Sequence, residues 1–591
     1  MLQTFYSEKV ASLTEQITNR KAKNKLFITG EIVTFLAFVL FFILFVSLDF
    51  ERWAIIASLI AVIVYAYIRK MDNANSRITN DLECHKGVYE DELKYLTGDF
   101  SAFDDGARYS DGRHAFAYDL DVFGKDSLYN RINRTVTSGG SDVLADNLRN
   151  LKGRENAAAI KELAEQTEWR ADFLATGRTA GRKIDTMAMI EAIKNVRELP
   201  FPRFASSGVS LAMAYVAMLG FYAAVACSIS GMIDGTIAVW WAIVQFFVVI
   251  ALCGKILKRV EKATGALQSQ ISSYIQLIAL VAECSDFKVE ENRKIVAQLD
   301  GAIVSFARMK KIIHSLESRS NGLGLLLFNI LFLNDFFLVR HFLKWQNEFI
   351  DKVNTWVEAI SEIDARISMA TMRYNHPEAV DAEIVEGSDK MIYEAKGLYH
   401  PFLGKEAVRN DFVIEHENYY IITGANMAGK STFLRAVGIN YVLAMAGMPV
   451  FADKFRVSVY SLFSSMRTTD DLTHGISYFN AELLRLKQLI DACRENRQTL
   501  IILDEILKGT NSLDKLNGSR LFLESISRLP VSGIIATHDL ELSKMAEQQP
   551  DVFHNYCFEI ELGAKVTYSY KITRGVARNQ NATYLLKQIL K

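Results

Sequence analysis

The sequence predicts an α/β domain at the C-terminal end of the chain, preceded by a mainly helical region that carries two membrane-spanning helical hairpins. Three observations predict this fold class. Strand-like and helix-like segments alternate from Ala379 onward, which is the pattern of an α/β domain. A loop with the spacing G-x-x-x-x-G-K-S runs from Gly424 to Ser431, between an apolar strand at Tyr420–Ile422 and a helix that opens at Lys430. Long uncharged runs occur earlier in the chain, in pairs.

The glycine loop has the spacing of a phosphate-binding P-loop, so the C-terminal domain is predicted to be a P-loop NTPase. Gly424 and Gly429 allow backbone N–H groups and the helix N-terminus to approach an anion closely. Lys430 would neutralise the β- and γ-phosphates of ATP, and the Ser431 hydroxyl would bind Mg²⁺, with Thr432 beside it. The other loop residues expected to contact the nucleotide are Ala425, Asn426, Met427 and Ala428.

Two further strands end in polar residues that suit ATP hydrolysis. The strand Thr499–Glu505 ends in two carboxylates; Asp504 is predicted to hold Mg²⁺ with its water, and Glu505 to polarise the attacking water. A third strand, Gly533–Ala536, leads to His538, which we expect to orient the γ-phosphate. The alternatives are surface acids at a strand end and a structural histidine.

Composition limits the remaining functions. The chain has 591 residues, half of them hydrophobic, and a formal net charge of −1. This charge gives no overall basic surface of the kind that wraps nucleic acid. The six cysteines show no C-x-x-C pair, so we expect reduced thiols rather than disulfides or a zinc site.

Two pairs of apolar runs predict membrane hairpins. The first pair is Ile32–Leu48 and Trp53–Ile68, and the second is Phe204–Ile233 and Gly235–Gly254. Each run is close to the length that crosses a bilayer. Lys and Arg flank the outer ends of both pairs, which predicts that all large segments lie in the cytoplasm. The alternative is a pair of buried helical hairpins in a soluble core.

The remaining segments are predicted to be mostly helical. The alternation of Phe116, Tyr118 and Leu120 predicts a short strand. The apolar stretch Asn321–Trp345 is interrupted by polar residues, which favours a buried soluble helix over a fifth membrane span. No cleaved signal peptide is predicted, and a prokaryotic inner membrane is the expected location.

Several motifs together resemble the MutS family of mismatch-repair ATPases. The loop GANMAGKST is similar to that family's G-P-N-M-G-G-K-S-T, with Ala425 and Ala428 as departures. The other matching stretches are His400–Pro401, Asn410–Asp411, Asp470–Leu483, Asp504–Asp514, Ala536–Leu542 and Tyr570–Ala582, and more loosely Tyr118–Leu148.

The resemblance implies an ABC-type ATPase that works as a dimer, with each nucleotide closed off by the partner subunit. Ser477 matches the family's signature serine, which reaches the γ-phosphate held by the other subunit, and Gly509–Ser512 matches a loop at the dimer interface. The chain departs from the family before Tyr118, where it has an apolar hairpin and no mismatch-reading domain. The DNA-reading parts are therefore predicted to be missing.

Taken together, these features predict a membrane-anchored, homodimeric ATPase with ATP and Mg²⁺ as ligands and the lipid bilayer as a partner, whose helical levers end in the membrane. A DNA-binding protein tethered to the membrane is the alternative, although no basic patch supports DNA, and an ABC transporter fits less well. The predicted segments are an N-terminal helix (1–25), transmembrane hairpin 1 (26–70), a helical linker (71–113), the first part of a core and lever domain (114–203), transmembrane hairpin 2 (204–254), the second part of the lever (255–375) and the ATPase domain (376–591).

Overall fold

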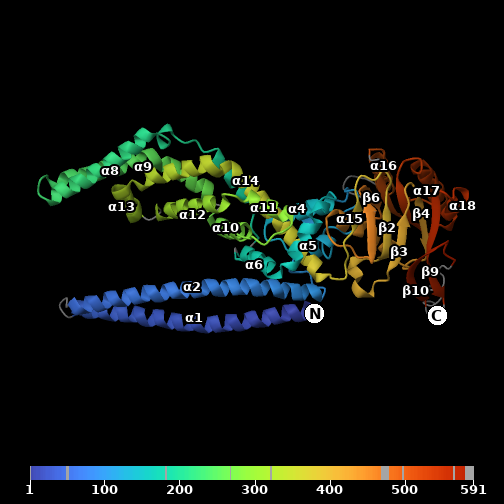
Figure 1. The fold of residues 1–591 in the computed structure, drawn as a ribbon, viewed down its shortest axis with the longest axis horizontal. Coiled ribbons are helices and arrows are strands. Elements are labelled where there is room, and N and C mark those ends of the chain that lie inside the picture. The colour runs from blue at the N-terminus through green and yellow to red at the C-terminus, as the bar shows by residue number, and fades with distance from the viewer. Residues whose placement is uncertain are drawn as a thin grey trace. The chain divides into compact units, whose positions relative to one another are not determined.

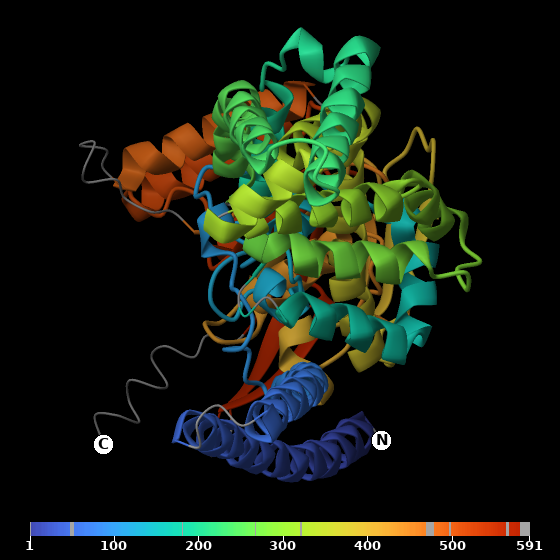
Figure 2. The same ribbon diagram turned by 90° about the vertical axis from the view of Figure 1, so that its left-hand side faces the viewer.

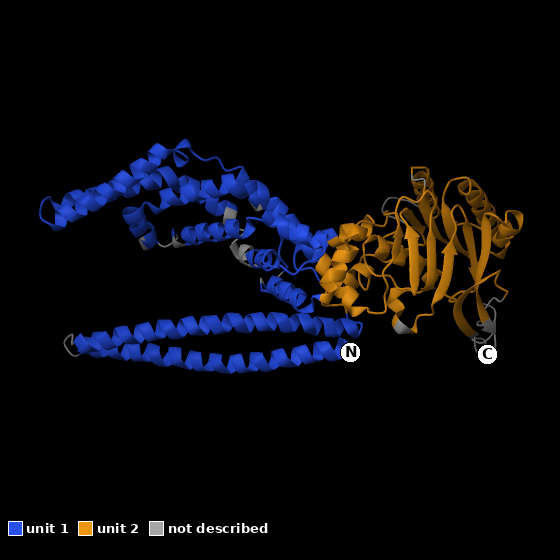
Figure 3. Cartoon of the chain, viewed as in Figure 1, with its two compact units in different colours: residues 1–99, 134–143, 166–365 blue, residues 100–133, 144–165, 366–591 orange. Residues whose placement is uncertain are grey.

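The computed structural model divides into two compact units (Figure 1, Figure 3). Unit 1 comprises residues 1–99, 134–143 and 166–365, and unit 2 comprises residues 100–133, 144–165 and 366–591. The residues that the structure describes are 2–47, 52–179, 181, 183–265, 268–319, 322–467, 478–495, 498–562 and 566–578.

Unit 1 contains a long pair of helices, α1 (Leu2–Ser47) and α2 (Arg52–Leu96), which lie side by side in both views (Figure 1, Figure 2). The first part of α1 and the last part of α2 are polar. The last part of α1 and the first part of α2 are apolar, and most of their large side chains are exposed. Arg69 donates to Glu31 at 3.0 Å where the apolar part begins, so the only acid in that stretch of α1 is paired.

A second apolar pair is formed by α8 (Gly208–Ile229) and α9 (Gly235–Gly265). Among the described residues, four helices are long and apolar enough to cross a membrane, namely α1, α2, α8 and α9 up to Ala263. These four helices coincide with the four predicted runs. Most of their large apolar side chains are exposed, whereas soluble proteins rarely expose large contiguous apolar patches.

The prediction of one continuous helix over Asn321–Trp345 is wrong. The described part of this stretch forms two helices, α13 (Gly322–Phe332) and α14 (Asn334–Asn375), which meet at an angle of 81°. Leu333 lies between them with a left-handed φ of 49°. The polar residue Asn329 accounts for the break, because its Oδ1 accepts a hydrogen bond from Asp335 N in the first turn of α14.

The other helices of unit 1 are α6 (Thr167–Arg178), α7 (Thr186–Arg197), α10 (Gln268–Ala282), α11 (Glu290–Gln298) and α12 (Ala302–Arg319); α4 (Ser138–Arg149) and α14 contribute to both units. A buried carboxylate on α14, Asp364, holds the turn before α4. It accepts hydrogen bonds from Val136 N, Thr137 N and Thr137 Oγ1 at 2.6–3.1 Å. A Cβ atom at Gly140 would lie 2.3 Å from its Oδ2, so only glycine allows this approach.

The pH dependence of unit 1 should reflect Asp364. Burial raises the pKa of this carboxyl from the usual 3.8 of an aspartate to about 6. Since the folded pKa is the higher one, the contribution of Asp364 to stability is complete below about pH 4 and is lost as the pH rises through 6. The stability advantage of the native protein over Asp364→Asn should therefore shrink by up to about 3 kcal/mol between pH 4 and pH 7. Thermal or chemical unfolding of both proteins across this range tests the prediction, and a constant difference would contradict it.

Unit 2 is built on a six-stranded sheet with the order β10-β9-β4-β8-β7-β6, in which all neighbours are parallel except β9 and β10. A four-stranded sheet has the order β1-β5-β2-β3. The strands are β1 (Glu383–Val385), β2 (Tyr393–Leu398), β3 (Asn410–Ile414), β4 (Tyr419–Gly424), β5 (Lys454–Ser458), β6 (Ser461–Ser465), β7 (Thr499–Asp504), β8 (Ser532–Thr537), β9 (Phe553–Leu562) and β10 (Val566–Arg574). The helices are α3 (Leu128–Ile132), α5 (Ala157–Glu165), α15 (Lys430–Met445), α16 (Tyr478–Glu495), α17 (Ser512–Ile526) and α18 (Met545–Gln548).

The topology of the larger sheet explains where a site can form. Strands β4, β8 and β7 are adjacent and parallel, so their carboxyl ends meet at one edge. Ligands of open α/β sheets bind outside this edge. The alternating α/β texture predicted from Ala379 onward is confirmed, as are the strands predicted before Gly424, Glu505 and His538.

The strand predicted at Phe116–Leu120 is wrong. These residues form consecutive turns, with Leu120 N donating to Phe116 O and Val122 N to Ala117 O. Phe116 and Leu120 are buried because the turns pack inside unit 2, where Leu120 lies against α15 and would clash with any side chain at Gly438. The alternation of apolar residues therefore reflects burial of Phe116 and Leu120 and not pairing in a strand.

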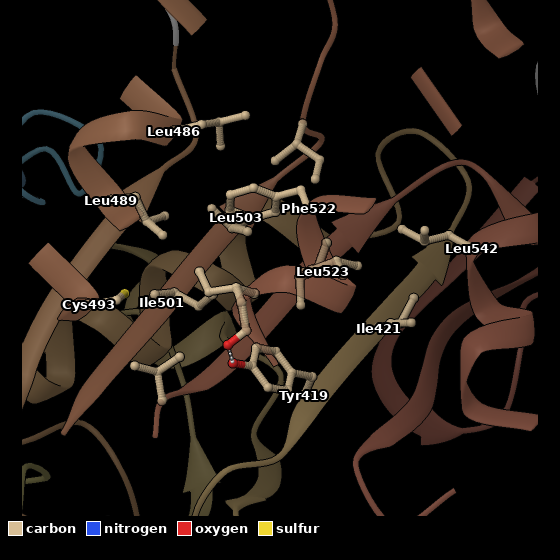
Figure 4. Packing of buried hydrophobic residues seen from close by; sticks show 14 of the residues in the cluster. Tyr419, Ile421, Leu486, Leu489, Cys493, Ile501, Leu503, Phe522, Leu523 and Leu542 are labelled. Atoms are coloured by element: carbon tan, nitrogen blue, oxygen red, sulfur yellow. Dashed lines mark hydrogen bonds between the residues drawn. The ribbon is translucent and has the colours of Figure 1, made fainter. Parts of the chain in front are cut away.

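A buried apolar cluster lies between the six-stranded sheet and the helices α16 and α17 (Figure 4). Side chains of β4, β7, α16 and α17 meet here, including Ile421, Leu489, Leu503 and Leu523. In the same cluster the Tyr419 hydroxyl donates to the last carbonyl of α17, at Ile526, over 2.9 Å. Packing and hydrogen bonding thus fix β4 and β7 against their helices.

Two leucines on α17 allow a matched test of this cluster. Leu523 is fully buried, whereas Leu521 on the same helix is 65% exposed. Leu523→Ala should destabilise unit 2 by about 2–5 kcal/mol, because it removes buried methyl groups and leaves a cavity. Leu521→Ala should change stability by less than about 0.5 kcal/mol. Equal shifts of the thermal unfolding midpoint in both variants would contradict the packing described here.

Candidate functional site

The loop between β4 and α15 requires glycine at both ends. Gly424 has a φ of 152°, and a Cβ atom there would lie 2.8 Å from the carbonyl oxygen of Phe558. Gly429 precedes α15 with a left-handed φ of 107°, and a Cβ atom there would lie 3.1 Å from the ring of Tyr570. Any side chain at these positions would displace the loop from its neighbours.

Lys430, the first residue of α15, is buried inside this loop. Its Nζ donates to the carbonyl oxygens of Gly424 at 2.8 Å and Ala425 at 3.1 Å. Burial lowers the pKa of Lys430, and the nearby carboxylates of Asp504 and Glu505 oppose that effect. The loop therefore holds an ammonium group at the edge of the sheet, facing two acids.

The acids at the end of β7 face different partners. Asp504 Oδ2 accepts a hydrogen bond from the Ser431 hydroxyl at 2.5 Å. Glu505 follows with a left-handed φ of 54°, and its N–H donates to Ala536 O on β8. A left-handed backbone is uncommon for a residue other than glycine, and such strain concentrates at functional sites.

Glu505 contacts two cationic or ionisable groups. Its Oε1 lies 3.2 Å from His538 Nε2, and its Oε2 accepts from Lys515 Nζ at 3.4 Å. Burial, and next the charge of Lys430, lower the pKa of His538. The imidazole is therefore neutral near pH 7, and its Nε2–H tautomer can donate to Glu505.

These groups line one cavity of about 810 Å³ in unit 2. Of the predicted site residues, the cavity wall contains Asn426, Met427, Ala428, Gly429, Lys430, Ser431, Thr432, Asp504, Glu505 and His538. Gly424 and Ala425 contribute through their carbonyl contacts with Lys430. The predicted signature serine, Ser477, lies outside the residues that the structure describes.

Sequence reasoning did not assign a second part of the cavity wall. That part includes Leu398, Tyr399, His400, Leu403, Glu406, Val408, Asn410, Phe558 and Tyr570, and Phe433, Ala436 and Lys508 also line the cavity. The stretches around His400, Asn410 and Tyr570 resemble the MutS family, and no other feature of the sequence points to a place in the cavity.

Hydrogen bonds fix this second wall. The Asn410 side chain donates to Tyr570 O at 3.1 Å and accepts from Ile572 N at 2.9 Å, next to an irregularity in the pairing of β10 with β9. Tyr570 itself has a left-handed φ of 51°. His400 is neutral because burial lowers its pKa to about 4, and its Nδ1 accepts from Phe402 N. The wall is thus aromatic at His400 and Tyr570 and carries no charge at His400, which suits a flat, apolar group.

The chemistry of the oxygen donors suits Mg²⁺. In the described part of the chain, no group of three or more His, Cys, Asp or Glu side chains could hold a metal ion without other ligands. Ser431 Oγ and the Asp504 carboxylate are hard oxygen donors that already lie 2.5 Å apart. Mg²⁺ prefers such donors and commonly takes only one or two of them from the protein, with phosphate and water completing its shell.

Comparison with known proteins identifies the domain that carries this cavity. A family model described as MutS domain V matches residues 420–587. The DNA mismatch repair protein MutS of Lysinibacillus sphaericus is 30% identical over 256 residues, which cover 41% of this chain and 28% of that protein. Residues 420–587 of this chain are therefore similar to domain V of the MutS family.

Other MutS proteins give the same result. The MutS of Thermotoga maritima is 30% identical over 227 residues (37% of this chain, 28% of that protein), and the MutS of Aquifex pyrophilus is 32% identical over 219 residues (36% and 25%). The chain therefore matches less than a third of the length of these MutS relatives. The predicted MutS resemblance is confirmed, and MutS domain V contains the loop residues, Asp504, Glu505 and His538.

Proposed function

We propose that this chain is a membrane-anchored ATPase that binds and hydrolyses ATP with Mg²⁺ as a dimer. The observation that carries the proposal is the convergence of a buried lysine, a serine–aspartate pair and a glutamate–histidine pair on one cavity of unit 2. The lysine and the two pairs suit different parts of phosphoryl transfer. Catalysis of this reaction depends mainly on positioning and charge stabilisation.

Each side chain of the site would have its own role in ATP hydrolysis. Lys430 would neutralise phosphate oxygens together with the N–H groups of the loop, and Ser431 and Asp504 would hold Mg²⁺, which supplies positive charge against the phosphates. Glu505 would accept a proton from the attacking water, with His538 holding its carboxylate through the neutral ring. Lys515 would hold the other carboxylate oxygen of Glu505 in place.

The dimer and the partner contacts rest on the family relationship. Ser477 and the loop Gly509–Ser512 would complete the site of a second copy. The described part of this region is compatible with such a role, because Asn511 caps α17 by accepting from Asp514 N, and Leu513 in the first turn is 68% exposed. ATP would then form part of the interface between two subunits.

The membrane anchor is supported by the four long apolar helices of unit 1. Their exposed side chains would face lipid, and the ATPase domain would lie in the cytoplasm. Movement of the connecting helices would couple the ATP cycle to the membrane segments.

ATPase activity of the purified, detergent-solubilised chain tests the proposal, with lipid added in one arm and DNA in another. We expect Mg²⁺-dependent hydrolysis and loss of the protein from solution when detergent is removed. A sample that does not hydrolyse ATP refutes the enzymatic part, and a sample that stays soluble without detergent refutes the anchor.

A second candidate is a DNA-binding protein of mismatch repair that is tethered to the membrane. It is favoured by the relatives, which are named as DNA mismatch repair proteins. This candidate predicts salt-dependent affinity for duplex, mismatched or branched DNA. Absence of binding to all three at low salt would exclude it.

A further inference from the structure

A break in the helical backbone lies beside the second apolar pair. Helix α13 ends at Phe332, α14 begins at Asn334, and the two axes are bent by 81°. The last carbonyls of any helix have no partner within the helix. In lipid such groups must find partners in the protein, because the hydrocarbon offers none.

Side chains of α8 and α9 supply partners for two of these carbonyls, those of Leu331 and Ile330. The Tyr222 hydroxyl donates to Leu331 O at 2.6 Å, and Gln245 Nε2 donates to Ile330 O at 2.8 Å. Gln245 is buried in the apolar part of α9, and its Oε1 accepts from Trp241 Nε1 at 3.2 Å. Tyr222 on α8 and Gln245 on α9 therefore donate hydrogen bonds to carbonyl oxygens at the end of α13.

The start of α14 is equally well satisfied. Asn329 is buried; its Oδ1 accepts from Asp335 N at 2.8 Å, and its Nδ2 donates to Leu325 O at 3.0 Å. Asp335, also buried, accepts from Arg319 Nε at 2.8 Å. Asn329 thus joins α13 to the first turn of α14, and Asp335 pairs with Arg319 of α12.

The positions of these contacts along α9 indicate how deep they would lie in a bilayer. Gln245 lies about 15 Å along the helix from Gly235, and Gly254, which is next to Arg319, lies about 28 Å along it. The hydrocarbon core of a bilayer is about 30 Å thick. If α8 and α9 span it, the contacts with Tyr222 and Gln245 fall near its middle, and Arg319 falls at the boundary where Lys255 begins the basic segment.

The outer face of α13 continues the apolar surface of α8 and α9. Helix α13 contains no charged residue, and it packs against α9 and α12 (Figure 1). Its exposed side chains are Leu326, Leu327, Phe328 and Phe332, with Leu327 53% and Phe328 46% exposed.

We propose that residues 322–335, the elbow, form a re-entrant segment that lies in the lipid of the cytoplasmic leaflet. The satisfied backbone break, the buried polar pairs and the exposed apolar face are together what a membrane-embedded turn requires. The membrane domain then consists of two hairpins and the elbow. This inference rests on the proposed membrane anchor.

Spin labels at single cysteines in the full chain, reconstituted in lipid bilayers, test the elbow. In the protein used for labelling, Ser or Ala replaces the partly exposed Cys84, Cys227 and Cys284, and the buried cysteines are left unchanged. Labels go to Leu327 and Phe328 on α13, to Val216 on α8 as a lipid-facing control, and to Val304 on α12 as a control for exposure to water. Collisions with oxygen report lipid, and collisions with a water-soluble nickel chelate report water.

We expect the labels at Leu327 and Phe328 to match Val216, with frequent oxygen and rare chelate collisions, and Val304 to show the opposite. Labels at Leu327 and Phe328 that collide with the chelate as often as Val304 overturn the elbow, and so do labels shielded from both probes, since protein would then cover α13. Chelate access at Val216 refutes the membrane anchor itself, so the two failures are distinguishable.

Discussion

Glu505→Gln should lower the rate of ATP hydrolysis by about 10²–10⁴-fold, the usual contribution of a general base. The amide keeps the size of the side chain and can still accept from Lys515, but it cannot take a proton from water. ATP binding should be retained, because the loop, Lys430 and the Ser431–Asp504 pair are untouched. Steady-state hydrolysis and equilibrium binding of a fluorescent ATP analogue measure the two effects separately.

The matched control is Glu547→Gln, which makes the same change at an exposed position on α18 of the same unit. This control should hydrolyse ATP at the native rate. Native hydrolysis by Glu505→Gln would remove Glu505 from the reaction. Loss of ATP binding in Glu505→Gln would instead mean that the carboxylate organises the site, and the assignment as a base would fail.

One half of the cavity could be predicted from the sequence because parallel strands bring their carboxyl ends to one edge. Loops that follow β4, β7 and β8 must then be neighbours, whatever the order of the segments between them. This rule places Lys430, Asp504 and His538 together without any knowledge of distances. It could not predict the left-handed backbone of Glu505, which depends on the hydrogen bond from its N–H to Ala536 O.

The other half of the cavity could not be predicted. His400, Asn410 and Tyr570 come from segments far apart in the sequence, and none of them carries a recognisable chemical pattern. Their meeting depends on tertiary hydrogen bonds, such as those between Asn410 and β10, and on an irregular strand pairing.

Two incorrect sequence predictions have a common origin, because hydrophobic patterns report burial and not the shape of the backbone. The alternation at Phe116 and Leu120 arises from packed turns. Around Asn329 and Asp335, polar residues seemed to mark an ordinary buried helix, but they pair at a break between two helices. In both cases the local pattern was real, and long-range hydrogen bonds decided the structure.

Lys430→Met should weaken ATP binding by about 10- to 150-fold, since hydrogen bonds to a charged group contribute about 1.5–3 kcal/mol. Methionine keeps the length and apolar stem of the side chain, but it leaves the carbonyls of Gly424 and Ala425 without their donor. Lys487→Met, an exposed change on α16, serves as the control and should bind ATP normally.

The same variant carries a second readout that does not depend on ATP. The charge of Lys430 is one of the causes that lower the pKa of His538, whose Nε2 lies 3.4 Å from Lys430 Nζ. Removing that charge should raise the pKa of His538, whereas Lys487→Met should leave it unchanged. NMR titration of labelled histidines measures this shift. Unchanged ATP affinity together with an unchanged His538 titration would show that Lys430 does not face the site as described, because both effects require its ammonium group to point into the cavity.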